Sequence, residues 1–163
     1  MMNKQDIYEL LRSRGMWHEI TEHPPVYNME EMAEITLPYP EADAKNLFVR
    51  DDKKRNYYLI TVRGDKRVDL KAFKRAHGTR SLTFASPEEM QQYLGLTPGA
   101  VTPMGLLNDS ECRVKLYLDR EFADSIGMIG LHPNDNTATV CMKTEDLVLL
   151  LREHGSEIEV VDI

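Results

Sequence analysis

Short runs of apolar and polar residues divide the chain into helices and strands. Residues 4–14 place Ile7, Leu10 and Leu11 on one helix face, after Asn3, which can cap the helix. A second helix is expected over 29–35 because Asn28 is followed three residues later by Glu31, as in a capping box. Three further helices are predicted from their capping residues. They start at Asp69, Ser86 and Thr144 and end near residues 77, 94 and 154, respectively.

Apolar and β-branched residues predict seven strands between these helices. Two of the runs are separated by the polar residues 51–55, which is typical of a hairpin. Residues 96–108 form a long irregular stretch. Because helices and hairpins are interleaved, the sequence favours an α+β fold with a mixed sheet, and without repeats or linkers we expect a single domain over 1–163. The expected strands are 17–21, 45–50, 57–63, 111–118, 126–131, 137–142 and 158–163.

Composition narrows the class of protein. The chain is 42% hydrophobic and 29% charged, which is ordinary for a folded domain. Cys112 and Cys141 are the two cysteines and neither lies in a CxxC motif, so a disulfide framework or a metal site is not expected, and a reducing cytoplasm fits best. The sequence has no apolar run near ~20 residues, so we expect no membrane partner.

Charge is distributed unevenly along the chain. Residues 45–80 hold 12 of the 20 Lys and Arg but only four of the 27 Asp and Glu, in a chain with net charge −7. Such a basic segment can dock a polyanion, and with 7% aromatic residues it favours phosphates over stacked bases. A solvated helix face is the alternative. The candidate tRNA-binding residues in this segment are Arg63, Lys66, Arg67, Lys71, Lys74 and Arg75.

Three local features could carry chemistry. Lys45 lies inside a β-run, where its ammonium needs water or an anion as a partner. Residues 99–103, Gly-Ala-Val-Thr-Pro, form a tight loop whose N–H groups can face a ligand. His132 and Asn134 flank a proline between two strands. Each feature also has an ordinary explanation, as a surface lysine, a connector and a hairpin turn.

In this order and spacing, the three features resemble the YbaK/prolyl-tRNA synthetase-associated editing domains over about residues 3–160. The residues 6–27 are most similar to the free-standing members that hydrolyse alanine mischarged onto proline tRNA. The resemblance implies a mixed, strongly curved β-sheet flanked by helices. It also implies a hydrolase of the aminoacyl-tRNA ester with no cofactor, no metal and no covalent nucleophile.

The resemblance also implies roles for single residues. Lys45, Gly99 and His132 would be catalytic, with Lys45 near the scissile ester and the loop presenting backbone groups. The general base stays open, since the ribose hydroxyl of the substrate could assist. Met104-Gly105 departs from the bulky aromatic and small apolar residues expected after the loop, and this bears on pocket size. The implied substrate-binding residues are Asn46, Leu47, Ala100, Val101, Thr102, Pro103, Met128 and Asn134, with Leu47, Val101 and Met128 as apolar walls.

Selectivity by size explains why such an activity is needed. A proline-specific synthetase cannot sterically exclude alanine, and binding discriminates small apolar differences by only ~1–3 kcal/mol per methylene. Three alternatives stay open: a cysteinyl-tRNA(Pro) deacylase, a non-catalytic tRNA- or synthetase-binding module, and a small-molecule regulatory domain. The expected partners are the acceptor end of proline tRNA and, as a further candidate, prolyl-tRNA synthetase. We expect a monomer or a weak homodimer.

Overall fold

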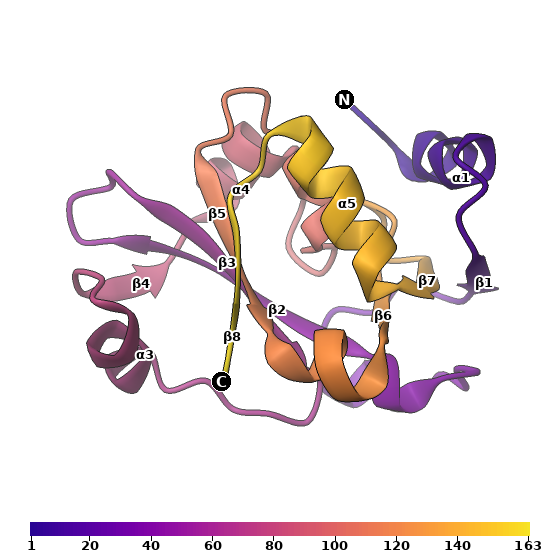
Figure 1. Ribbon diagram of the computed structural model, residues 1–163, viewed down its shortest axis with the longest axis horizontal. Coiled ribbons are helices and arrows are strands. Elements are labelled where there is room, and N and C mark those ends of the chain that lie inside the picture. Colours follow the sequence, from indigo (N-terminus) through magenta and orange to yellow (C-terminus); the bar gives the residue numbers. More distant parts are fainter.

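The computed structural model describes residues 1–163, with the exception of the Met29 side chain. Its strands form a five-stranded sheet in the order β4-β2-β3-β5-β8 and a three-stranded sheet in the order β1-β7-β6 (Figure 1). The strands are β1 (His18–Glu22), β2 (Ala44–Asp51), β3 (Tyr57–Arg63), β4 (Leu82–Phe84), β5 (Val114–Asp119), β6 (Met128–Leu131), β7 (Ala138–Lys143) and β8 (Ile158–Val161).

Helices flank the two sheets, and their ends follow from local chemistry. Asn3 and Asp6 form a capping box at the start of α1, and Ser86 and Glu89 form another at the start of α4. No described helix has the length and the apolar character needed to cross a membrane. The helices are α1 (Lys4–Ser13), α2 (Met29–Met32), α3 (Leu70–His77), α4 (Pro87–Leu94) and α5 (Thr144–His154), with shorter turns η1 (Pro40–Ala42), η2 (Pro103–Asn108) and η3 (Phe122–Ile126).

The larger sheet is mixed. β2 pairs antiparallel with β3 and β4, whereas β3–β5 and β5–β8 are parallel. The predicted hairpin is present, and the Asp51 carboxylate holds its turn by accepting the main-chain N–H groups of Lys53 and Arg55. The α+β class with a mixed sheet is therefore confirmed.

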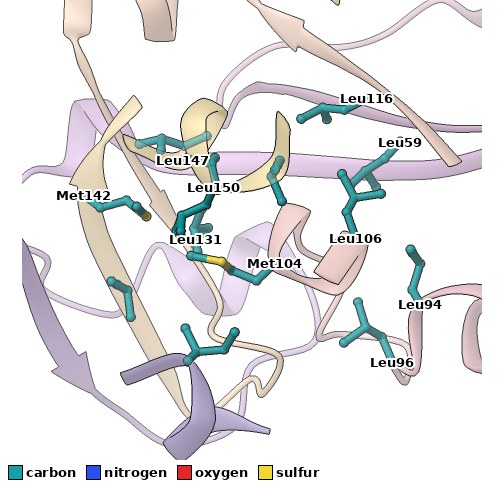
Figure 2. Packing of buried hydrophobic residues seen from close by; sticks show 14 of the residues in the cluster. Leu59, Leu94, Leu96, Met104, Leu106, Leu116, Leu131, Met142, Leu147 and Leu150 are labelled. Atoms are coloured by element: carbon teal, nitrogen blue, oxygen red, sulfur yellow. The ribbon is translucent and has the colours of Figure 1, made fainter. Parts of the chain in front are cut away.

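The main hydrophobic core lies between α5, η2 and both sheets (Figure 2). Met104 of η2 lies there beside Leu150 of α5 and Leu131 of β6, and Leu106 of η2 lies beside Leu59 of β3. Burying side chains of this size stabilises the fold by ~1.5–3 kcal/mol each. A smaller cluster on the other face of β2 and β3 includes Val49, Ile60 and Phe73 of α3.

The structure differs from the sequence prediction in five places. The strands form two sheets instead of one, and a parallel bridge between Asp43 and Gly130 links them. The strand expected over 126–131 begins at Met128 because residues 122–126 form a π-turn. The helix expected over 29–35 ends at Met32, and β4 was not predicted. Cys112 has φ 52°, so β5 begins only at Val114.

Candidate functional site

A small cavity lies where the start of β2 meets the end of β6 and the loop before η2. Its volume is about 190 Å³, below the ~300–1,000 Å³ of pockets for drug-sized ligands. Its walls come from the segments 26–32, 43–46, 99–101 and 130–132 and from Thr139. Among the described residues that line the cavity, Lys45 is the one Lys or Arg and Asp43 is the one carboxylate.

Lys45 is the second residue of β2 and is held by the loop that follows β3. Its Nζ donates a hydrogen bond to the main-chain oxygen of Lys66 at 3.1 Å. An ammonium has three N–H donors, so this contact leaves two for a ligand. Lys45 forms no ion pair among the described residues, which leaves its positive charge available to the cavity.

Gly99 gives the loop before η2 its shape. Its φ is +90°, and a Cβ at this position would lie 2.8 Å from Cδ1 of Tyr27 and 3.3 Å from the Val26 oxygen. A larger residue would therefore be strained and would clash with the cavity wall. Within the described chain, the N–H groups of Gly99 and Val101 have no hydrogen-bond acceptor, and both residues line the cavity. These two donors are available to an oxyanion.

His132 enters the opposite wall as a neutral ring. Its Nδ1 lies 2.9 Å from the Ala138 oxygen, which can only accept, so Nδ1 carries the proton. Burial lowers the pKa of His132, the Ala138 hydrogen bond opposes this, and the nearby His23 lowers it further. At neutral pH, Nε2 therefore has a lone pair that can accept a proton or a hydrogen bond.

A second histidine, His23, contacts the Thr139 side chain of the cavity wall. The His23 Nδ1 lies 2.9 Å from the Pro24 oxygen, and its Nε2 lies 2.9 Å from Oγ1 of Thr139. Since the Pro24 oxygen takes the Nδ1 proton, the Thr139 hydroxyl donates to Nε2 when the ring is neutral. The rings of His23 and His132 lie 6.1 Å apart, so His23 lies behind His132 and Thr139, the two of these residues that line the cavity.

Asp43 places a carboxyl group at the edge of the cavity. Burial raises its pKa to about 6, and a hydrogen bond from the Ala44 N–H opposes that rise. The same residue also lines a larger adjoining hollow beside Arg63 and Asp65. No local pattern in the sequence marks this residue, because it lies at the long-range bridge to Gly130.

A model of the aminoacyl-tRNA editing domain matches residues 23–150. The chain belongs to the aminoacyl-tRNA editing domain family. It is 36% identical over 160 residues to the prolyl-tRNA editing protein ProX of Acetoanaerobium sticklandii, covering 98% of this chain and 97% of ProX. It is 34% identical to the mouse (Mus musculus) prolyl-tRNA synthetase associated domain-containing protein 1, covering 94% and 92% of the two chains.

The fold matches a crystal structure of a candidate trans-editing enzyme for prolyl tRNA synthetase. The TM-score is 0.68 with 21% identity, and the match covers 99% of this chain and 97% of the other. At this identity the match shows the shared fold of the editing domain, and the roles of single residues rest on the geometry of this chain.

Five of the site residues expected from the sequence line the cavity of this editing domain: Lys45, Asn46, Gly99, Val101 and His132. The Asn46 amide is already bonded on both sides. Its Nδ2 donates to the Val101 oxygen at 3.2 Å, and its Oδ1 accepts from Oγ1 of Thr61 at 2.7 Å. Asn46 therefore contacts the loop and not only the cavity.

Three more expected residues belong to the loop itself and do not line the cavity. These residues, Ala100, Thr102 and Pro103, are buried. Thr102 donates from Oγ1 to the His132 oxygen at 2.6 Å, and Pro103 begins η2. Because these side chains are buried, the part of this loop that could face a ligand is its main chain, and the role of the three residues in substrate binding stays a prediction.

The remaining three expected residues lie elsewhere. Leu47 packs in the smaller core cluster, because alternation along β2 turns it away from Asn46. Met128 lines a separate hollow with Trp17 and Tyr39, since β6 reaches the cavity only with its last residues. Asn134 has φ 61° and donates from Nδ2 to the Met2 oxygen at 3.0 Å, so its side chain holds the N-terminal segment.

The structure divides the basic residues of the editing domain into two groups. Arg63 pairs with Asp65 and Glu121, and Lys66 pairs with Asp119 and Glu121. By contrast, four exposed residues form no ion pair among the described residues: Arg67, Lys71, Lys74 and Arg75. Three of these, Lys71, Lys74 and Arg75, line a hollow of about 350 Å³ beside Ser81.

Proposed function

We propose that this protein hydrolyses the ester of aminoacyl-tRNA, with alanine mischarged onto proline tRNA as its substrate. The observation that carries this proposal is the cavity of about 190 Å³ bounded by Lys45, Gly99 and His132 in a chain of the editing family. The relative named a prolyl-tRNA editing protein matches nearly the whole chain, which supports proline tRNA as the carrier.

The walls of the cavity favour a small aminoacyl group. Val26, Met32 and Val101 supply apolar surface, while Tyr27 lies against the Gly99 position and limits depth. A pocket of this size selects by exclusion, which a synthetase cannot do against a residue smaller than its own substrate. Cysteine is close to alanine in size, so cysteinyl-tRNA is the first competitor to test.

The reaction proceeds by attack of water on the ester carbonyl carbon. The carbonyl oxygen becomes an oxyanion, which the N–H groups of Gly99 and Val101 and the ammonium of Lys45 stabilise. The C–O bond to the ribose then breaks and gives free alanine and a ribose hydroxyl. The proton lost by water passes to the leaving oxygen through Nε2 of His132 or through the neighbouring ribose hydroxyl.

The tRNA needs a docking surface outside the cavity. The group Lys71, Lys74 and Arg75 on α3 has free charge, and Arg67 lies on the segment that joins α3 to β3. Figure 1 shows this segment running from the end of β3 to α3, away from the three-stranded sheet. We assign the acceptor-stem phosphates to this surface, with binding that weakens as salt rises.

The test is a deacylation assay with proline tRNA charged with alanine, cysteine or serine, and with alanine on its own tRNA as a control for tRNA identity. We expect the highest kcat/KM for alanyl-tRNA(Pro). Preference for the cysteinyl substrate would establish the alternative amino-acid specificity. Salt-dependent tRNA binding without hydrolysis of any ester would overturn the enzymatic proposal in favour of a binding module.

A further inference from the structure

A hydrogen-bonded relay ties the cavity loop to the centre of the five-stranded sheet. Thr61 donates from Oγ1 to Asn46 Oδ1 at 2.7 Å, and Asn46 donates from Nδ2 to the Val101 oxygen at 3.2 Å. Thr61 and Asn46 lie directly opposite each other in the β2–β3 register. Thr61 also pairs with Leu118 of β5, so the relay starts on a central strand that is held on both sides.

The relay can run in only one direction. The Val101 carbonyl accepts and never donates, so Asn46 must present its NH₂ group to the loop. The amide oxygen then faces Thr61, whose hydroxyl must donate. A reversed amide would place two oxygens against each other at Val101 and would leave the buried Thr61 without its acceptor.

We infer that Thr61 is a positioning residue for ester hydrolysis: through Asn46 it fixes the Val101 carbonyl, and with it the neighbouring Gly99 and Val101 N–H groups. This inference rests on the proposed function, in which those N–H groups stabilise the oxyanion. On the other side of the loop, Thr102 donates to the His132 oxygen at 2.6 Å. The loop is thus held between β2 and β6, and donors held in this way need not reorganise during the reaction.

The apolar residues around Thr61 indicate that its hydroxyl is present for the hydrogen bond that it forms. Leu59, Ile60 and Val62 are as completely buried as Thr61, and valine has nearly the same shape as threonine. A buried hydroxyl costs free energy unless it is bonded. The hydroxyl at this position is bonded only within the relay among the described residues, so Thr61→Val removes that contact and little else.

The test measures kcat and KM for alanyl-tRNA(Pro) together with the thermal midpoint. We expect Thr61→Val to lower kcat about 10-fold, with KM within about 2-fold and a thermal midpoint lowered by only about 2–4 °C, as for loss of one buried hydrogen bond. Thr61→Ser keeps the hydroxyl and should retain most of the rate. Asn46→Asp replaces the NH₂ donor by an oxygen at Val101 and should lower kcat about 100-fold.

A double variant separates the relay from a general effect on the sheet. If Thr61 acts through Asn46, Thr61→Val should lower kcat by less than about 2-fold in the Asn46→Asp background. Thr144→Val is the matched control, because Thr144 is a buried threonine whose hydroxyl has no partner in the described structure; it should keep the wild-type kcat.

Three outcomes would overturn the inference while the wild type hydrolyses the ester. These are a wild-type kcat in Thr61→Val, an equal loss in Thr61→Ser, and additive losses in the double variant. A wild type that hydrolyses no aminoacyl ester would instead refute the proposed function.

Discussion

The basic segment 45–80 has two groups of cations, one near the cavity and one on α3. The two groups have similar residue types, but the first is bonded to carbonyl and carboxylate groups of the protein and the second forms no ion pair among the described residues. At the cavity end, Lys45 bonds the Lys66 oxygen, while Arg63 and Lys66 are paired with carboxylates. At the α3 end, Lys71 and Arg75 are exposed and form no ion pair in the described structure. The first group has its charge placed or neutralised by the fold, and the second offers its charge to solvent or to a partner.

The number of Lys and Arg residues in a segment therefore does not measure how much positive charge is free to bind a ligand. Asp65 pairs with Arg63 locally, but the carboxylates that neutralise Lys66 and complete the pairing of Arg63 are those of Asp119 and Glu121, which are more distant in sequence than any local pattern reaches. Among the charges of the segment, only Lys45 lines the small cavity. We therefore expect catalysis, stability and tRNA affinity to depend on different lysines.

The largest effect is expected at Lys45. Lys45→Ala should lower the rate of alanyl-tRNA(Pro) hydrolysis at least about 100-fold, ~2.7 kcal/mol, because the developing oxyanion loses a preorganised positive charge. Single-turnover kinetics measures this rate independently of tRNA release. Lys53→Ala, at the exposed hairpin turn, is the matched control and should hydrolyse at the wild-type rate. Full activity in Lys45→Ala would show that Lys45 has no catalytic role that the cations of α3 lack.

The second effect is on stability, at Lys66. Its Nζ lies 2.8 Å from Asp119 Oδ2, and the Asp119 side chain is only 1% exposed. Lys66→Met leaves that carboxylate buried without its partner, so we expect the free energy of unfolding to fall by ~2 kcal/mol in urea titrations. The KM for tRNA should stay within about 2-fold. A large rise in KM without loss of stability would place Lys66 in the docking surface.

Much of the fold could be predicted from the sequence, because its signals are local. The capping boxes at Asn3 and Ser86 and the hairpin around 51–55 depend on neighbouring residues. The division into two sheets could not be predicted, since it depends on the long-range bridge between Asp43 and Gly130. The π-turn at 122–126 leaves no periodic pattern in the sequence.

The site could be predicted in part, for a related reason. Lys45, Gly99 and His132 stand out by residue type or loop pattern, and the structure brings them to one cavity. Thr61 sits in an apolar run and looks like an ordinary β-branched core residue. Its role depends on which residue faces it across the strands, and that register is visible only in the folded chain.

The third effect concerns tRNA affinity and α3. Replacing Lys71, Lys74 and Arg75 together by Gln should raise KM about 10-fold at physiological salt and reduce the magnitude of the slope of log K against log salt by about 3, with kcat unchanged. The matched control replaces three other cations that form no ion pair among the described residues: Arg113, Lys143 and Arg152. An equal loss in the control would mean that overall charge, and not α3, attracts the tRNA.

The smallest effect is expected at Asp43, and its sign depends on pH. Burial raises the pKa of Asp43 from 3.8 to about 6, so the folded protein binds this proton more tightly than the unfolded chain. The folded state therefore loses stability as pH rises from about 4 to about 6, and the full penalty remains above that range.

Asp43→Asn should raise the free energy of unfolding by ~1 kcal/mol at pH 7.5 and by almost nothing at pH 3.5. In the control Asp65→Asn the sign should reverse, because the hydrogen bond from Arg63 lowers the pKa of Asp65. A gain of stability in Asp43→Asn that is the same at both pH values would show that its carboxyl is not the group that titrates.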